Sequence, residues 1–346
     1  MQSGFIHRAI FSALTALIKA KYFFGEVIIR KVVAMAAPDP CVLDTLAFSG
    51  LDEAEMRRRA LSSRAGLDLF EHELSFIRRR LAGRDRSKPS LIVLPDGPAT
   101  IESYDAFVEQ LSDRFNIALI EMPGFGFSFA RHPDALDFEQ SAQIVAAAIR
   151  DLDMPKAVLV GACVQGLIAA RVAEIVPDHL AGLIIAQTAD FAAERVWSGE
   201  VLDAQGNLAR PFEGQVSFRL ARERATVDWW AAFVAGPKLP LEAFQKEARS
   251  VLRCGCSNAL ASLMQKWNAL DPLPEFRPQV PAAIIWGLAD KSHTATDRRT
   301  VLRYAPDATY IERDDIGHFP DLEAPELIAD TAADLLSRGS QADPAD

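Results

Sequence analysis

Blocks of apolar residues alternate with helically spaced segments along most of the chain. The runs typical of buried strands are 91–94, 117–120, 157–160, 180–186, 280–286 and 308–311. Helical spacing fills the intervals 101–115, 138–152, 167–176 and 326–336. Because strands alternate with helices through short connections, we expect an α/β fold with a mostly parallel sheet covered by helices on both faces.

Two segments depart from this rhythm. Residues 67–78 alternate apolar and polar positions, which predicts two short strands with a tight connection. Residues 190–272 contain no buried-strand pattern but carry helical stretches around 219–234 and 241–267. We therefore expect four parts: an N-terminal helical extension (1–66), a core (67–189 and 273–338), an inserted helical cap (190–272) and a tail (339–346).

The N-terminal extension is basic and apolar. Residues 1–35 hold five Lys or Arg residues and a single acid, Glu26. Lys19 and Lys21 interrupt the apolar run that a signal peptide needs, and no run reaches the ~18 residues of a spanning helix. We favour helices packed on the core or on a second subunit; a basic amphipathic helix on a membrane surface is the alternative.

Composition narrows the class of protein. The chain has 346 residues, 49% of them hydrophobic, and is long enough for one large core. Its net charge of -10 argues against nucleic acid as a partner. Its four cysteines lack C-x-x-C spacing, so neither a disulfide framework nor a zinc site is indicated. A reducing, cytoplasmic location is therefore expected. The sequence implies no metal or organic cofactor.

Cys163 occupies the position of greatest chemical interest. It follows the apolar run at 157–160 and Gly161, and it precedes a segment of good helix formers from Leu167. A side chain between a strand and a helix N-terminus lies where negative charge is favoured, which suits a nucleophilic thiol. The alternative is that Cys163 is an inert buried thiol.

An activated cysteine needs a base and a group that orients the base. Asp290 follows the strand at 280–286, and His318 lies in the loop after the strand at 308–311. Because parallel strands deliver such residues to one sheet edge, we expect His318 to take the proton of Cys163 and Asp290 to orient His318. Four other histidines are expected on surface turns or near helix ends, solvated rather than catalytic: His72, His132, His179 and His293. His293, three residues after Asp290, could alternatively support Asp290.

Backbone N–H groups near Cys163 should stabilise an oxyanion. Val164 supplies one at the helix N-terminus, and Gly97 is the best second donor, since Pro98 has no N–H. The alternative for Gly97 is an ordinary turn. Gln165 could point into the substrate pocket, and the cap residues Trp229 and Trp230 are candidates for its lining, with ordinary cap packing as the alternative.

Taken together, these motifs resemble the α/β-hydrolase superfamily. The matching segments, in order, are Leu94-Pro-Asp-Gly-Pro98, Glu121-Met-Pro-Gly-Phe-Gly-Phe-Ser128, the turn at Cys163, Trp286-Gly-Leu-Ala-Asp290 and Gly317-His-Phe-Pro320. The turn is similar to the family's nucleophile elbow, which usually carries serine, and the order of nucleophile, acid and histidine is the expected one. Two departures are Pro95-Asp96, where the family has His-Gly, and Gln165, where it has glycine.

Within the superfamily, the cysteine resembles that of acyl and aminoacyl shuttles acting on thioesters in nonribosomal peptide pathways. That resemblance implies an acyltransferase or thioesterase whose substrate could be bound to a carrier protein. Exchange between two thioesters is near balance, which suits a thiol nucleophile better than a serine. The alternatives are an ester or lactone hydrolase with the same triad, and a non-catalytic binding protein that has kept only the fold.

Overall fold

The computed structural model describes residues 53–61, 64–211, 214–215, 217–218, 223–253 and 259–341, with two single positions at 13 and 16. Most of the predicted N-terminal extension, the membrane-surface alternative and the last residues of the tail therefore lie outside the described residues. Among the residues that are described, no helix is long and apolar enough to cross a membrane.

A nine-stranded sheet forms the centre of the molecule, in the order β1-β2-β4-β3-β6-β7-β8-β9, with β5 paired to β2. The strands are β1 (Leu67–His72), β2 (Ser75–Ala82), β3 (Ser90–Leu94), β4 (Asn116–Ile120), β5 (Phe129–Ala130), β6 (Ala157–Ala162), β7 (Leu180–Ala186), β8 (Ala282–Gly287) and β9 (Thr309–Arg313). The six strands from β4 to β9 in this order pair in parallel, while β1, β2 and β5 form antiparallel pairs. The expected mostly parallel sheet is confirmed.

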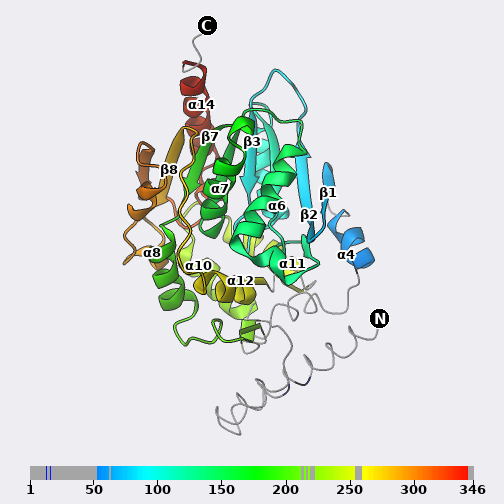
Figure 1. Ribbon diagram of the computed structural model, residues 1–346, viewed down its shortest axis with the longest axis vertical. Coiled ribbons are helices and arrows are strands. Elements are labelled where there is room, and N and C mark those ends of the chain that lie inside the picture. The colour runs from blue at the N-terminus through cyan, green and yellow to red at the C-terminus, as the bar shows by residue number, and fades with distance from the viewer. Residues whose placement is uncertain are drawn as a thin grey trace.

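Helices cover both faces of the sheet (Figure 1). They are α4 (Glu53–Ala60), α5 (Asp105–Leu111), α6 (Phe138–Arg150), α7 (Val164–Ile175), α8 (Phe191–Trp197), α10 (Ala231–Val234), α11 (Leu241–Arg253), α12 (Ala259–Asn268), α13 (Pro320–Glu323) and α14 (Pro325–Gln341). A further π-helical segment spans Glu223–Trp230.

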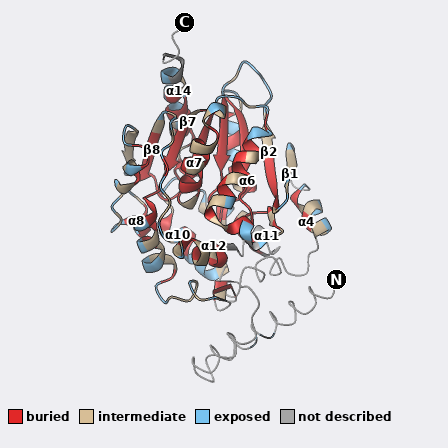
Figure 2. Cartoon of the chain, viewed as in Figure 1, coloured by how far each residue is buried: buried red, intermediate tan, exposed pale blue. Residues whose placement is uncertain are grey.

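Side chains alternate between two cores. In β6, Leu159 packs with residues of α6 and α7, whereas Val158 and Val160 pack with residues of α5 and α14. Buried residues accordingly concentrate along the central strands (Figure 2). This alternation follows from the two-residue repeat of a strand, and it makes the sheet a rigid platform for the loops at its edge.

The carboxyl ends of the parallel strands carry the residues of interest. Asp96 follows β3, Cys163 follows β6, Asp290 follows β8 and His318 follows β9. Helices α8, α10, α11 and α12 lie beside this edge, in the lower part of Figure 1. The segment expected to be a cap is therefore helical in its described parts, while its limits at 190 and 272 remain a prediction.

Candidate active site

Cys163 stands at a strained turn between β6 and α7. Its backbone φ of 50° and ψ of -128° lie outside the regions that L residues favour. Its N–H donates to the Ala186 carbonyl (3.0 Å), and its carbonyl accepts from the Gly166 N–H (2.9 Å) and the Thr188 hydroxyl (2.9 Å). A conformation costing about 1–3 kcal/mol persists only where neighbours fix it, and these three bonds do so.

Two glycines allow the turn to pack. A Cβ at Gly161 would lie 2.4 Å from the Gln165 carbonyl oxygen, and a Cβ at Gly166 would lie 2.0 Å from Thr188 Oγ1. The tight approach therefore falls at Gly166, one residue beyond the position where the family has glycine. Gln165 can keep a side chain for this reason.

The prediction for Gln165 differs from the structure. Its side chain is fully buried, and Gln165 is not among the residues that line the cavity beside Cys163. Neither its amide oxygen nor its amide nitrogen has a hydrogen-bond partner among the described residues. Gln165 is the second residue of α7, and the helix carries its side chain into the protein interior rather than toward the cavity.

His318 and Asp290 come together at the sheet edge. Nδ1 of His318 lies 2.6 Å from Oδ2 of Asp290, and both residues are buried. Asp290 also accepts hydrogen bonds from the Ser292 N–H and hydroxyl and from Gln187 Nε2. The carboxylate is thus held in place, and it can in turn fix the imidazole ring with Nδ1–H directed at it.

Asp96 is a neighbour of this pair that sequence reasoning did not assign to the site. Its Oδ2 lies 3.6 Å from Nε2 of His318, and its side chain is buried. The candidate ligand atoms of Asp96, Cys163 and His318 all lie within 4.8 Å of one another. The sequence did contain a sign that Asp96 is unusual, because it stands where the family that these motifs resemble has glycine.

The charges of these groups are coupled. Burial raises the pKa of the Cys163 thiol above its ordinary value, and the Asp96 carboxylate raises it further while His318 opposes both. Burial disfavours the His318 imidazolium, but the charges of Asp290 and Cys163 outweigh that effect and hold the pKa of His318 well above its usual value. Burial likewise raises the pKa of Asp96, against the influence of His318. These directions favour a protonated thiol at Cys163, and with that thiol uncharged Asp290 is the main support of a positive charge on His318.

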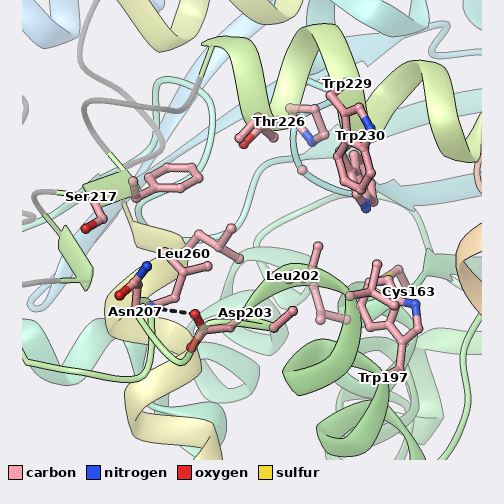
Figure 3. A pocket seen from close by; sticks show the side chains of 18 of the residues that line it. Cys163, Trp197, Leu202, Asp203, Asn207, Ser217, Thr226, Trp229, Trp230 and Leu260 are labelled. Atoms are coloured by element: carbon pink, nitrogen blue, oxygen red, sulfur yellow. Dashed lines mark hydrogen bonds between the residues drawn. The ribbon is translucent and has the colours of Figure 1, made fainter.

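A cavity of about 360 Å³ opens from Cys163 toward the helices that cover the sheet edge. Its described lining is mainly apolar and includes Trp197, Leu202 and Phe218. Figure 3 shows Cys163 and Trp197 at one end, with Asn207 and Ser217 at the other. Such a shape suits a ligand with an extended apolar part.

Both candidate tryptophans line this cavity. The buried ring of Trp230 lies edge-on to His318, with 4.9 Å between ring centroids, and its Nε1 has no partner among the described residues. Trp229 is 56% exposed and stacks on Phe233. Trp230 therefore belongs to the inner end of the cavity and Trp229 to its outer wall.

The two candidate oxyanion donors also line the cavity. Val164 is the first residue of α7, so its N–H points out of the helix N-terminus beside Cys163. The Gly97 N–H is hydrogen-bonded to the Asp96 carboxylate, a contact that lowers the pKa of Asp96. An oxyanion would have to displace that carboxylate to reach Gly97.

The expectation that His293 lies on a solvated turn is wrong. His293 is buried, and its ring stacks on Trp197 of α8 with 4.4 Å between centroids. Its Nδ1 is 3.0 Å from the Thr296 hydroxyl, and burial lowers the pKa of His293 to about 3. The short 3₁₀ turn after Asp290 folds inward against α8, and this long-range contact leaves no trace in the local sequence pattern.

Glu194 is a second buried acid near the site. Its Oε1 accepts from the Ala189 N–H, whereas Oε2 has no partner among the described residues. Burial raises the pKa of Glu194 to about 8, so the carboxyl is largely protonated at neutral pH. It was not identified from the sequence.

Comparison with known proteins identifies the family of this chain. Residues 89–325, more than half of the chain, match the family described as alpha/beta hydrolase fold. The chain belongs to this family. Among solved structures, the enol-lactonase from Burkholderia xenovorans is similar (TM-score 0.57, 21% identity, covering 78% of this chain and 100% of that chain). So is epoxide hydrolase A from Mycobacterium thermoresistibile (TM-score 0.60, 17% identity, 78% and 98%). At these identities, the likeness concerns the fold.

A curated relative is similar in sequence over a shorter stretch. It is the pimeloyl-[acyl-carrier protein] methyl ester esterase of Vibrio parahaemolyticus, 32% identical over 139 residues, or 39% of this chain and 51% of that protein. The match thus spans about half the length of this relative. Family membership therefore rests on the longer match over residues 89–325.

Proposed function

We propose that this chain is an acyl-transfer enzyme that acts on acyl or aminoacyl thioesters through an acyl-Cys163 intermediate. The observation behind the proposal is the geometry at the turn. The Cys163 thiol, which lines the apolar cavity, lies within 4.8 Å of a ring nitrogen of His318, and Asp290 contacts Nδ1 of the same ring. These are the components of an activated nucleophile.

In the proposed reaction, His318 accepts the thiol proton as Sγ of Cys163 attacks the carbonyl carbon. The Asp290 carboxylate stabilises the imidazolium that forms. The N–H groups of Val164 and Gly97 receive the developing oxyanion, once the Asp96 carboxylate has released Gly97. Collapse of the tetrahedral intermediate expels the donor thiolate and leaves a thioester on Cys163, which a second thiol or water then attacks.

The high pKa of His318 favours a thioester over an oxygen ester as substrate. An imidazolium held between carboxylates is a weak proton donor, because losing its proton leaves those charges uncompensated. A departing alkoxide depends on such a donor, whereas a thiolate leaves readily without one. The acyl chain would occupy the cavity under residues 190–272, which we assign as a cap on a core of residues 67–189 and 273–338.

A carrier protein is the proposed source of the acyl group. The name of the curated relative from Vibrio parahaemolyticus includes an acyl-carrier protein. A substrate tethered to such a carrier would reach Cys163 through the opening beside Trp229, whose ring is exposed at the outer wall.

The second candidate is an ester or lactone hydrolase with the same three residues. The sequence similarity to a methyl ester esterase favours it. Both candidates require Cys163, and they differ in the leaving group that His318 must protonate.

A matched pair of substrates separates the two candidates. One acyl group is presented as a thioester of a small thiol and as the corresponding oxygen ester, with and without a second thiol as acceptor. Acyl transfer to the acceptor, with the thioester consumed faster, would support the first candidate. Preferential consumption of the oxygen ester, with free acid as the only product, would favour the hydrolase. Cys163→Ala should abolish either reaction.

A further inference from the structure

The geometry points to a divalent zinc site at the same turn, formed by Sγ of Cys163, Nε2 of His318 and a carboxylate oxygen of Asp96. The three ligand atoms lie within 4.8 Å of one another, and all three side chains are buried. Thiolate, imidazole and carboxylate are the ligand types that zinc takes, with three protein ligands and one open position in a site accessible to small molecules. The inference goes beyond the proposed function and does not depend on it.

One of the three distances between ligand atoms is close to that of a zinc centre. Tetrahedral bonds of usual length place ligand atoms about 3.4 to 3.6 Å apart. Oδ2 of Asp96 is already 3.6 Å from Nε2 of His318. The distances from Sγ of Cys163 to the other two ligand atoms are no more than 4.8 Å, so rotation of the Cys163 and Asp96 side chains would have to shorten them on binding.

His318 is prepared for this role on both sides of its ring. Its Nδ1 is held by Asp290 at 2.6 Å, which directs the lone pair of a neutral ring to Nε2. That nitrogen has no hydrogen-bond partner among the described residues, although His318 is fully buried. A carboxylate that orients a metal-binding histidine through its other nitrogen is a usual supporting contact in zinc sites.

Charge supplies a further reason. Sγ of Cys163 and the carboxylate of Asp96 lie close together in a buried place, and none of the described residues that line the cavity is basic. A divalent cation between them would neutralise both negative charges. As the Sγ–zinc bond forms, the thiol proton leaves to solvent.

A second group, Asp290, His293 and His318, is also close enough to hold a metal. Its carboxylate is already engaged, because Asp290 receives hydrogen bonds from Ser292 and Gln187 and contacts His318 Nδ1. The group around Asp96 therefore carries the inference, and zinc there would occupy both the nucleophile and the base and inhibit the proposed reaction reversibly.

The test measures zinc binding directly, in the full chain with Cys41, Cys254 and Cys256 replaced by serine so that Cys163 is the only thiol. Zinc is titrated against a chromophoric chelator, and Co²⁺ serves as a spectroscopic probe. We expect one ion per chain and a thiolate-to-cobalt charge-transfer band. Cys163→Ser should abolish the band, and Asp96→Asn should weaken zinc binding by at least about tenfold. Asp96→His, which supplies another ligand, should retain binding.

Three results would overturn the inference: no saturable zinc binding, equal affinity in Asp96→Asn, or binding that survives Cys163→Ser. If the triple-serine chain does not fold, the difference in stoichiometry between the wild-type chain and Cys163→Ser gives the same answer. Circular dichroism establishes that each variant is folded. Since no acyl substrate is used, failure of the proposed reaction leaves this test unaffected.

Discussion

Asp96 and His318 face each other across 3.6 Å, from Oδ2 of the carboxylate to Nε2 of the ring. The other ring nitrogen contacts Asp290 at 2.6 Å. His318 therefore lies between two buried carboxylates, one of which stands on the loop that also carries a candidate oxyanion donor. This arrangement couples the protonation of the thiol, the imidazole and the loop.

Removing the charge of Asp96 should make Cys163 more acidic. The Asp96 carboxylate raises the pKa of the thiol, so Asp96→Asn should shift the pH dependence of Cys163 alkylation by iodoacetamide to lower pH, by roughly one unit. Rates are measured from pH 6 to 10 by intact mass. Asp153→Asn, which changes an exposed carboxylate paired with Arg86, is the matched control. An unchanged profile in Asp96→Asn, or a shift to higher pH, would contradict the coupling.

Asp290→Asn should slow acylation of Cys163 by about a thousandfold or more. The change keeps the shape of the side chain but removes the charge that supports the imidazolium, and an Asp-to-Asn change behind a catalytic histidine has an effect of this order. Single-turnover acylation measures the loss. Asp153→Asn, which changes an exposed carboxylate paired with Arg86, is the matched control and should leave acylation unchanged. A rate within threefold of the wild type would argue against the orienting role.

Glu194→Gln should flatten the dependence of stability on pH. Burial raises the pKa of Glu194 to about 8 in the folded chain, against 4.5 for an exposed glutamate. Between these values the folded state binds the proton and the unfolded state does not, so the stability that the wild type has below pH 4.5 is lost as the pH rises through 8. The loss is about 1.4 kcal/mol per unit within that window. Urea unfolding at pH 5 and pH 8 tests this, and parallel losses in both proteins would refute it.

Gly166→Ala should destabilise the chain by about 1–3 kcal/mol. Its Cβ would lie 2.0 Å from Thr188 Oγ1, which itself bonds the carbonyl of Cys163. Gly199→Ala is the matched control, because a Cβ there meets nothing within 4 Å; it should change stability by no more than about 0.5 kcal/mol. Thermal unfolding of both variants gives the comparison. Similar melting temperatures would mean that the turn can relax.

The sequence predicted the features that local pattern determines. Apolar runs located the strand before Cys163, and the rule that parallel strands end at one edge brought Asp290 and His318 together. The alternation at 67–78 predicted the hairpin of β1 and β2. Each of these depends on residues close in sequence or on a general property of sheets.

The remaining features depend on contacts between distant segments. His293 is buried because it stacks on Trp197, about a hundred residues earlier in the chain. The carboxylate of Asp96 reaches His318 from a loop more than two hundred residues away. The first turn of α7 sets the direction of the Gln165 side chain, and the close approach to Thr188 falls at Gly166 instead. Local periodicity contains no information about such pairs.

The most direct test of the central claim is the intact mass of the chain after mixing with acyl and aminoacyl thioesters, beside Cys163→Ala. We expect an adduct equal to the acyl group on the wild-type chain, absent from the variant and discharged by a second thiol. If neither chain is acylated and no thioester is consumed, the acyl-Cys163 mechanism is wrong. Turnover that persists unchanged in Cys163→Ala would contradict it equally.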